Sequence, residues 1–140
     1  MKMLNQIQIM KKSILFVFLL MAATVSFAQR DLSFVVEGPE MAYNQIKVVN
    51  ETSLSNFNCR IVLLNNDKSV KEVYGVFELA AKGESDTNTN NANRIKKGSL
   101  LGIQFQKSFT ADVSFFVEYK DYPFFDVIII HLIDPDSEYE

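Results

Sequence analysis

The sequence has few of the residues from which catalytic and metal sites are built: one cysteine, Cys59, and one histidine, His131, among 140 residues. A lone cysteine cannot close an internal disulfide, so stability must come from burying apolar side chains. A lone histidine excludes any mechanism that needs two imidazoles in one chain, which includes most zinc sites. The sequence offers no Ser/His/Asp set, metal-binding cluster or phosphate-binding glycine loop. We therefore expect no enzyme activity, no catalytic residue, no metal and no cofactor.

The sequence also lacks a hydrophobic run long enough to span a membrane. Two lysines, Lys11 and Lys12, precede an apolar segment over residues 14–28, which would measure about 22 Å as a helix. The hydrocarbon core of a bilayer is about 30 Å thick, so we expect no stable membrane insertion. A basic start followed by a short apolar run is instead typical of a secretory signal peptide.

The end of this leader fits cleavage by a signal peptidase. Ser26 and Ala28 place small side chains at the third and first positions before a cut that leaves Gln29 as the mature N-terminus. The predicted leader therefore covers residues 1–28, and it resembles the short leaders of bacterial exported proteins. A lipoprotein would need a cysteine directly after the cut, where the chain has none. We expect the mature protein in the periplasm, at the cell surface or in the medium.

Positive charge is scarce as well. Fourteen basic residues stand against 17 acidic ones, which gives a net charge of −3. The leader contains Lys2, Lys11 and Lys12 and no acidic residue, so its removal makes the mature domain more acidic still. This balance disfavours nucleic acid and anionic membranes as partners.

Alternation of apolar and polar residues recurs along the chain, and this pattern predicts β-strands. Seven segments carry this pattern: 32–36, 43–50, 57–64, 70–79, 94–106, 113–119 and 124–133. The last of them is apolar on both faces, so we expect it at the centre of its sheet. Residues 82–93 are polar and are predicted to form a loop. Because no long helical pattern follows residue 30, residues 29–140 are predicted to form one all-β domain, an antiparallel β-sandwich of about seven strands.

Two stretches resemble the immunoglobulin-like domains of bacterial exported proteins. Residues 46–52 form an early strand that ends in an asparagine and a small polar residue. Residues 97–105 place a turn glycine, Gly98, before a strand that contains Gly102 and Phe105. The resemblance implies an immunoglobulin-like β-sandwich that binds or braces a partner, and it brings no catalytic residues with it.

Aromatic residues gather at the expected hairpin between the last two strands, where Tyr122 and Phe124 flank Pro123. Exposed aromatic rings bind sugars or protein grooves by burying flat apolar area. We therefore regard Tyr122 and Phe124 as candidate partner contacts. The alternative is that Phe124 begins the core strand while Tyr122 shields it.

The polar loop supplies further candidate contacts, Asp86, Asn88 and Asn90, which repeat the first three ligand positions of a calcium-binding loop. Asn91 stands where such a loop needs glycine, and Lys97 stands where it needs a bidentate glutamate, so an EF-hand is rejected. A solvated loop that contacts a partner is favoured over a looser calcium site.

These observations favour a non-catalytic binding module for a protein or glycan partner. A first alternative is an exported protease inhibitor that presents an extended loop, either residues 96–99, which contain Lys97 and Gly98, or the asparagine-rich loop. A second is a structural subunit of an envelope assembly that pairs through an edge strand. Cys59 is expected to act as a small core residue, and His131 as a residue near the sheet surface with a hydrogen-bond partner.

Overall fold

The structure is a computed structural model that describes residues 26–28, 32–38, 44–88 and 95–136. Within these ranges it contains nine β-strands, and it has no helix that is long and apolar enough to cross a membrane. The strands are β1 (Phe27–Ala28), β2 (Ser33–Val35), β3 (Asn44–Asn50), β4 (Phe57–Leu64), β5 (Val70–Leu79), β6 (Ser85–Asn88), β7 (Leu100–Gln106), β8 (Ser114–Asp121) and β9 (Asp126–Ile133). Most of the predicted leader, and Gln29 after the predicted cut, lie outside the described residues.

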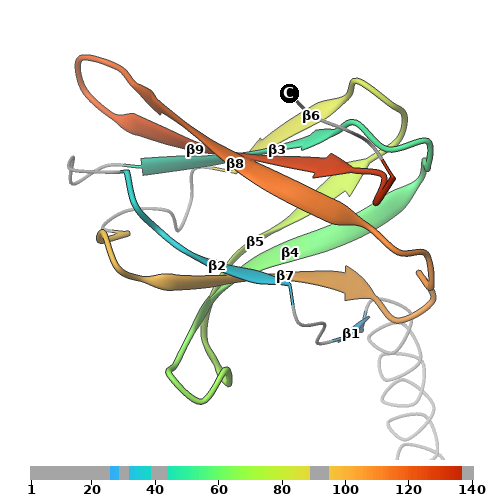
Figure 1. Cartoon of the computed structure of the whole chain (residues 1–140), viewed down its shortest axis with the longest axis horizontal. Helices are drawn as coiled ribbons and strands as arrows, with labels where there is room; N and C mark the ends of the chain where they lie inside the picture. Colours follow the sequence, from blue (N-terminus) through green and yellow to red (C-terminus); the bar gives the residue numbers. More distant parts are fainter. Residues whose placement is uncertain (1–25, 29–31, 39–43, 89–94, 137–140) are drawn as a thin grey trace, which may run out of the picture.

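The strands form two sheets that face one another (Figure 1). In the first, which we call sheet A, the order is β1-β7-β4-β5, and β2 also pairs with β7. In the second, sheet B, the order is β6-β3-β9-β8. Alternation gives most of the strands one apolar face, and stacking the two sheets buries both sets of apolar residues. The predicted all-β sandwich is confirmed.

One strand pair differs from the antiparallel prediction. β3 and β9 run parallel, with Asn44 opposite Asp126 and Asn50 opposite Leu132, whereas the other pairs are antiparallel. Alternation shows which face of a strand is buried, but it does not show which strand lies beside it. β9 lies between β3 and β8, so the central position predicted for the last segment is confirmed.

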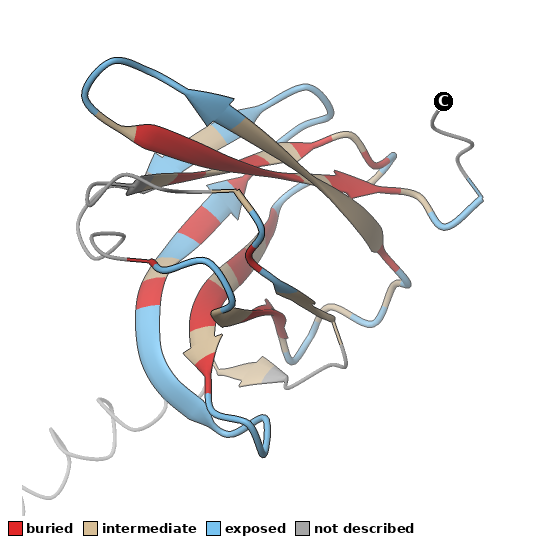
Figure 2. Cartoon of the chain, turned by 60° about the vertical axis from the view of Figure 1, so that its left-hand side comes forward, coloured by how far each residue is buried: buried red, intermediate tan, exposed pale blue. Residues whose placement is uncertain are grey.

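The core lies between the sheets and is rich in phenylalanine. Phe57, Phe77 and Phe105 of sheet A are at most 1% exposed, and Phe109 stacks on the ring of Phe57 at 4.7 Å between centroids. Sheet B contributes Ile46, Val48, Ile128, Ile130 and Leu132. Figure 2 shows buried segments in red along strands of both sheets. Each such side chain contributes about 1.5–3 kcal/mol on burial, which is how a domain without an internal disulfide is held together.

Two short strands lie where the sequence predicted none. β6 falls inside the predicted loop 82–93 and pairs with β3, so the loop prediction is wrong for Ser85–Asn88. This strand is polar on both faces and lies at a sheet edge, where backbone hydrogen bonds alone can hold it. β1 pairs with Phe105 and Gln106 of β7, although both of its residues belong to the predicted leader.

Candidate functional site

The aromatic residues singled out in the sequence form the tip of the β8–β9 hairpin, which we call the aromatic tip (residues 122–125). The backbone N–H of Tyr122 donates to the carbonyl of Phe125 at 2.9 Å, and the rings of these residues stack with centroids 5.0 Å apart. Phe124 is 82% exposed and Tyr122 is 44% exposed. Phe124 therefore projects from a closed, hydrogen-bonded turn and does not enter the core.

Lys97 and Gly98 lie in a tight turn before β7. The N–H of Ser99 donates to the carbonyl of Lys96 at 3.0 Å, and the N–H of Gly98 donates to the carbonyl of Val36 at 2.7 Å. Gly98 has a φ of +92°, a conformation that glycine adopts without strain. Lys97 is exposed. This turn lies at the same end of the sandwich as the aromatic tip (Figure 1).

Two of the three polar candidates of residues 82–93, Asp86 and Asn88, are described by the structure, and neither is brought to the aromatic tip. Asp86 lies in β6, half-buried, and its Oδ2 accepts a hydrogen bond from the N–H of Glu78 at 3.1 Å. Asn88 pairs through its backbone with Ile46, and Asn90 lies outside the described residues. Over the described part of the chain, no group of three or more acidic, cysteine or histidine side chains is arranged to hold a metal ion.

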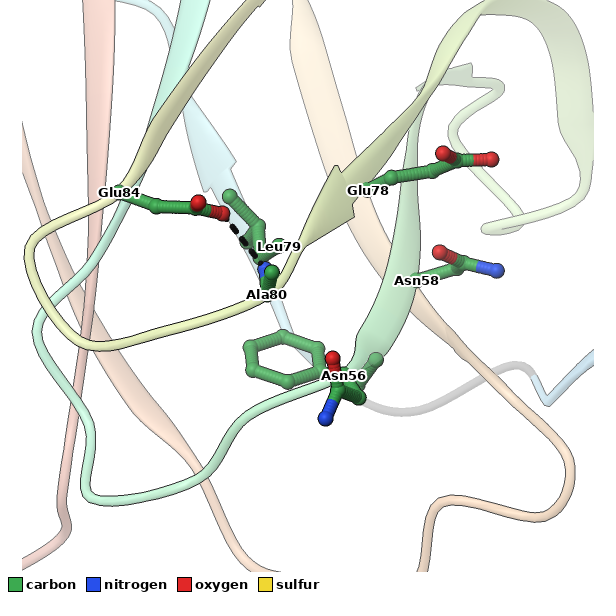
Figure 3. A pocket seen from close by; sticks show the side chains of 7 residues that line it. Asn56, Asn58, Glu78, Leu79, Ala80 and Glu84 are labelled. Atoms are coloured by element: carbon green, nitrogen blue, oxygen red, sulfur yellow. Dashed lines mark hydrogen bonds between the residues drawn. The ribbon is translucent and has the colours of Figure 1, made fainter.

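A second surface, which the sequence analysis missed, is a polar groove of about 540 Å³ where β4 begins and β5 ends (Figure 3). Its lining residues are Asn56, Phe57, Asn58, Glu78, Leu79, Ala80 and Glu84. In Figure 3 the side chains of Asn58 and Glu78 project side by side from paired positions of β4 and β5. An Oε2 atom of Glu84 accepts a hydrogen bond from the N–H of Ala80 at 2.8 Å.

The groove is lined by both polar and apolar residues. Glu78 and Glu84 are exposed, whereas Phe57 and Leu79 are at most 2% exposed and belong to the core. Two carboxylates and two amides can accept and donate hydrogen bonds to hydroxyl groups. No sequence signal could have assembled this set, because Asn58 and Glu78 meet only through the register of the β4–β5 pair.

His131 lies on the outer face of sheet B and is held from several sides. Its Nδ1 is 3.0 Å from Oε2 of Glu51, and its Nε2 is 3.5 Å from Oε2 of Glu118. The ring of Phe116 stacks on the imidazole at 4.3 Å. The predicted histidine near the sheet surface with a hydrogen-bond partner is confirmed.

Cys59 belongs to the other sheet, where its side chain is buried in the core. Burial, with a smaller contribution from the charge of Asp86, raises the pKa of the thiol to about 12. Thiolate is the reactive form of cysteine, and it is suppressed at this position. Cys59 therefore acts as a core residue, as predicted, and it lies in a different layer from His131.

Asn50 begins the sequence Asn50-Glu51-Thr52, which matches the acceptor pattern for N-glycosylation. Asn50 is fully buried. Its Oδ1 accepts a hydrogen bond from the N–H of Thr52 at 3.0 Å, and its Nδ2 donates to the carbonyl of Leu54 at 2.8 Å. In the folded protein the amide is therefore a structural group and not an accessible modification site.

No protein-family model matches this chain, and no curated protein and no solved structure is significantly similar to it.

Proposed function

We propose that the protein is an exported, non-catalytic binding module of the immunoglobulin-like β-sandwich type that recognises a protein partner through the aromatic tip. Its leader would direct it to the periplasm, the cell surface or the medium. The observation that carries the proposal is the 82% exposure of Phe124 on a turn closed by the hydrogen bond between Tyr122 and Phe125.

The geometry of the tip favours a protein groove as the ligand. A projecting phenylalanine gains about 1.5–3 kcal/mol when a partner buries it, and the closed turn reduces the entropy lost on binding. Pro123 adds rigidity beside it. Anchors of this kind, a large aromatic side chain that fills a pocket, dominate the energy of many protein interfaces.

The non-catalytic part of the proposal rests on Cys59 and His131. The thiol is buried with a pKa of about 12, and the imidazole is held between Glu51 and Glu118 in the opposite sheet. The inhibitor alternative has less support, because residues 96–99 form a tight turn tied to Val36 and not an extended loop.

Photo-cross-linking in the exporting cell tests this proposal. A photoreactive phenylalanine analogue at position 124 should give a discrete cross-linked product, whereas the same analogue at the exposed position 107 of the opposite end should not. Against the partner so identified, Phe124→Ala should weaken binding by about tenfold or more. The matched control Val35→Ala, at another exposed apolar position, should leave the affinity unchanged. Equal cross-linking from both positions, or full affinity of Phe124→Ala, would contradict the proposal.

A glycan is the second candidate ligand, and the polar groove is the observation that favours it. Two amides and two carboxylates line a volume of about 540 Å³, within the range of small-ligand sites. Calorimetry against a panel of oligosaccharides should detect binding that Asn58→Ala and Glu78→Gln both abolish and Asn66→Ala, on the exposed β4–β5 turn, preserves. Binding that survives both groove substitutions would place the glycan elsewhere.

A further inference from the structure

His131 is the one histidine of the chain, and it lies where three elements of sheet B meet. β9 carries it between β3 and β8. Strand register places Phe116 of β8 opposite it, and the Phe116 ring stacks on the imidazole with an interplanar angle of 4°. Only 15% of the histidine side chain is exposed. Stacking and burial therefore hold the imidazole ring against its protein neighbours.

The two ring nitrogens face carboxylates from two different elements. Nδ1 lies 3.0 Å from Oε2 of Glu51, in the segment between β3 and β4, and Nε2 lies 3.5 Å from Oε2 of Glu118 on β8. The first contact is a hydrogen bond. Nε2 is buried, and it has no hydrogen-bond partner among the residues that the structure describes. The second contact can therefore become a hydrogen bond only when Nε2 carries a proton.

The two contacts depend on how many protons the imidazole carries, because an ionised carboxylate only accepts hydrogen bonds. A neutral ring has a single N–H, and the hydrogen bond to Glu51 places that proton on Nδ1. Nε2 then turns a lone pair toward the carboxylate of Glu118. The imidazolium has an N–H on each nitrogen and a positive charge, so it can donate to both carboxylates at once.

The other charged groups around the imidazole have partners or positions of their own. Nζ of Lys120 lies 3.6 Å from Oε1 of Glu118, the oxygen that does not face His131. Asp134, which follows β9, accepts hydrogen bonds from the segment between β3 and β4. On β3 the same face of the sheet carries Lys47, one row away from the imidazole. The charges that face the two ring nitrogens directly are therefore the two glutamates.

We propose that protonation of His131 closes a clasp across sheet B, in which the imidazolium joins Glu51 to Glu118. Histidine is the side chain that ordinarily changes its charge between pH 5 and 8. β8 is an edge strand, paired only with β9 among the described strands, so the clasp adds a side-chain tie to that edge. The stabilisation is fully present in acid, and the tie to Glu118 is lost as the pH rises through the titration of the imidazole. The clasp does not depend on the proposed partner, because the aromatic tip joins the opposite ends of β8 and β9.

Urea unfolding at about pH 5.5 and about pH 8 tests the clasp, because this window spans the charge change of histidine. The unfolding constant of the wild-type chain should be at least about threefold larger at the higher pH. His131→Gln and Glu118→Gln should each remove most of this rise, whereas the matched control Glu72→Gln, at an exposed position of sheet A, should keep it. A wild-type unfolding constant that is equal at both pH values overturns the proposal, and so does a rise that Glu118→Gln leaves intact.

Nuclear magnetic resonance of the imidazole nitrogens follows the protons in the folded wild-type chain, where the single histidine gives one pair of signals. At the alkaline end of the titration the proton should lie on Nδ1, and at the acid end both nitrogens should be protonated. Exchange protection of the β8 amides, corrected for the effect of pH on unstructured amides, should be greater at the acid end, and Glu118→Gln should abolish that difference. A neutral ring protonated on Nε2 overturns the proposal, as does β8 protection that is equal at both ends.

Discussion

At the scale of single residues, the buried ionisable groups make the domain sensitive to alkali. The pKa of the Cys59 thiol is raised from 9.0 to about 12 by burial. The pKa of the Tyr74 phenol is raised from 10.0 to about 12, first by burial and then by the charge of Glu72. Both groups stay protonated in the folded protein at pH values where the unfolded chain releases its protons.

We predict that the free energy of unfolding falls as the pH rises from about 9 toward 12. Below pH 9 Cys59 is protonated in both states and its contribution is fully present. Above it only the unfolded chain ionises, which costs the fold up to about 1.4 kcal/mol per pH unit. Urea unfolding followed by circular dichroism at pH 7, 9, 10 and 11 measures this slope. Cys59→Val, which keeps an apolar side chain there, should remove the fall between pH 9 and 10 and leave only the contribution of Tyr74 above pH 10. An unchanged slope between pH 9 and 10 in this variant would contradict the assignment.

The buried amide of Asn50 is the second residue with a large expected effect. Asn50→Ala would leave the N–H of Thr52 and the carbonyl of Leu54 without their side-chain partner inside the protein. Unsatisfied buried groups of this kind cost about 1–3 kcal/mol in total stability. We therefore predict that Asn50→Ala lowers the free energy of unfolding, measured with urea, by about 1–3 kcal/mol. Asn66→Ala, at an exposed position of the β4–β5 turn, should stay within about 0.5 kcal/mol of wild type, and similar values for both variants would argue against a structural role of Asn50.

At the scale of the secondary-structure elements, Gly102 permits close packing on the outer face of sheet A. A Cβ atom at this position would lie 2.9 Å from Cδ1 of Leu64 and 3.1 Å from Cγ2 of Val62. Both side chains belong to β4, the strand next to β7. They lean over the glycine, which explains why they are buried although they point away from the core.

We predict that Gly102→Ala destabilises the domain by about 1–3 kcal/mol, because Leu64 must move to admit the methyl group. Thermal unfolding of the single variants and of Gly102→Ala combined with Leu64→Ala forms a double-mutant cycle. The alanine at position 102 should be tolerated better once Leu64 is shortened. Strictly additive effects would show that the two side chains do not compete for this space.

The elements differ in how far the sequence could predict them. The bounds of β4 and β5 were predicted to the residue, although only Phe57–Ile61 and Val76–Leu79 alternate regularly in burial. The irregular middle of the pair, where the register shifts beside Val62 and Leu64, could not be read from alternation. β6 could not be found this way, because Ser85–Asn88 is polar on both faces and its pairing with β3 depends on backbone groups. The parallel pairing of β3 with β9 also leaves no mark in the alternation of either strand.

The candidate sites differ in the same way: a site marked by a local sequence pattern could be located, and a site formed by contacts between strands could not. The aromatic tip could be located because Tyr122-Pro123-Phe124 is a local signal for a turn with aromatic side chains. The exposure of Phe124 could not be predicted, because this residue directly precedes a buried strand. The conformation of the turn determines whether its side chain points into the core or into solvent. The polar groove depends on contacts between β4, β5 and the turn before β6, which no local pattern specifies.

At the scale of the whole molecule, the question is how far the fold depends on the predicted leader. β1 pairs with two residues of β7, the N–H of Lys107 donates to the carbonyl of Ser26, and the guanidinium of Arg60 lies 5.1 Å from the ring centroid of Phe27. None of these leader residues belongs to the core cluster between the sheets. The hydrophobic energy of the sandwich therefore resides in the segments after the predicted cut.

We predict that the chain recovered after export begins at Gln29, as intact-mass measurement would show, and that it remains a cooperatively folded β protein. Its free energy of unfolding should be about 1–2 kcal/mol lower than that of a chain that keeps residues 26–28, because it lacks one short strand pair and a half-buried ring. Circular dichroism and urea unfolding of the two forms measure this difference. Because residues 26–28 cover this edge of β7, the amide of Lys107, which donates to the carbonyl of Ser26, should exchange faster with solvent in the processed form than in the longer one. An unfolded chain that begins at Gln29 would contradict the prediction and would mean that β1 is part of the cooperative unit.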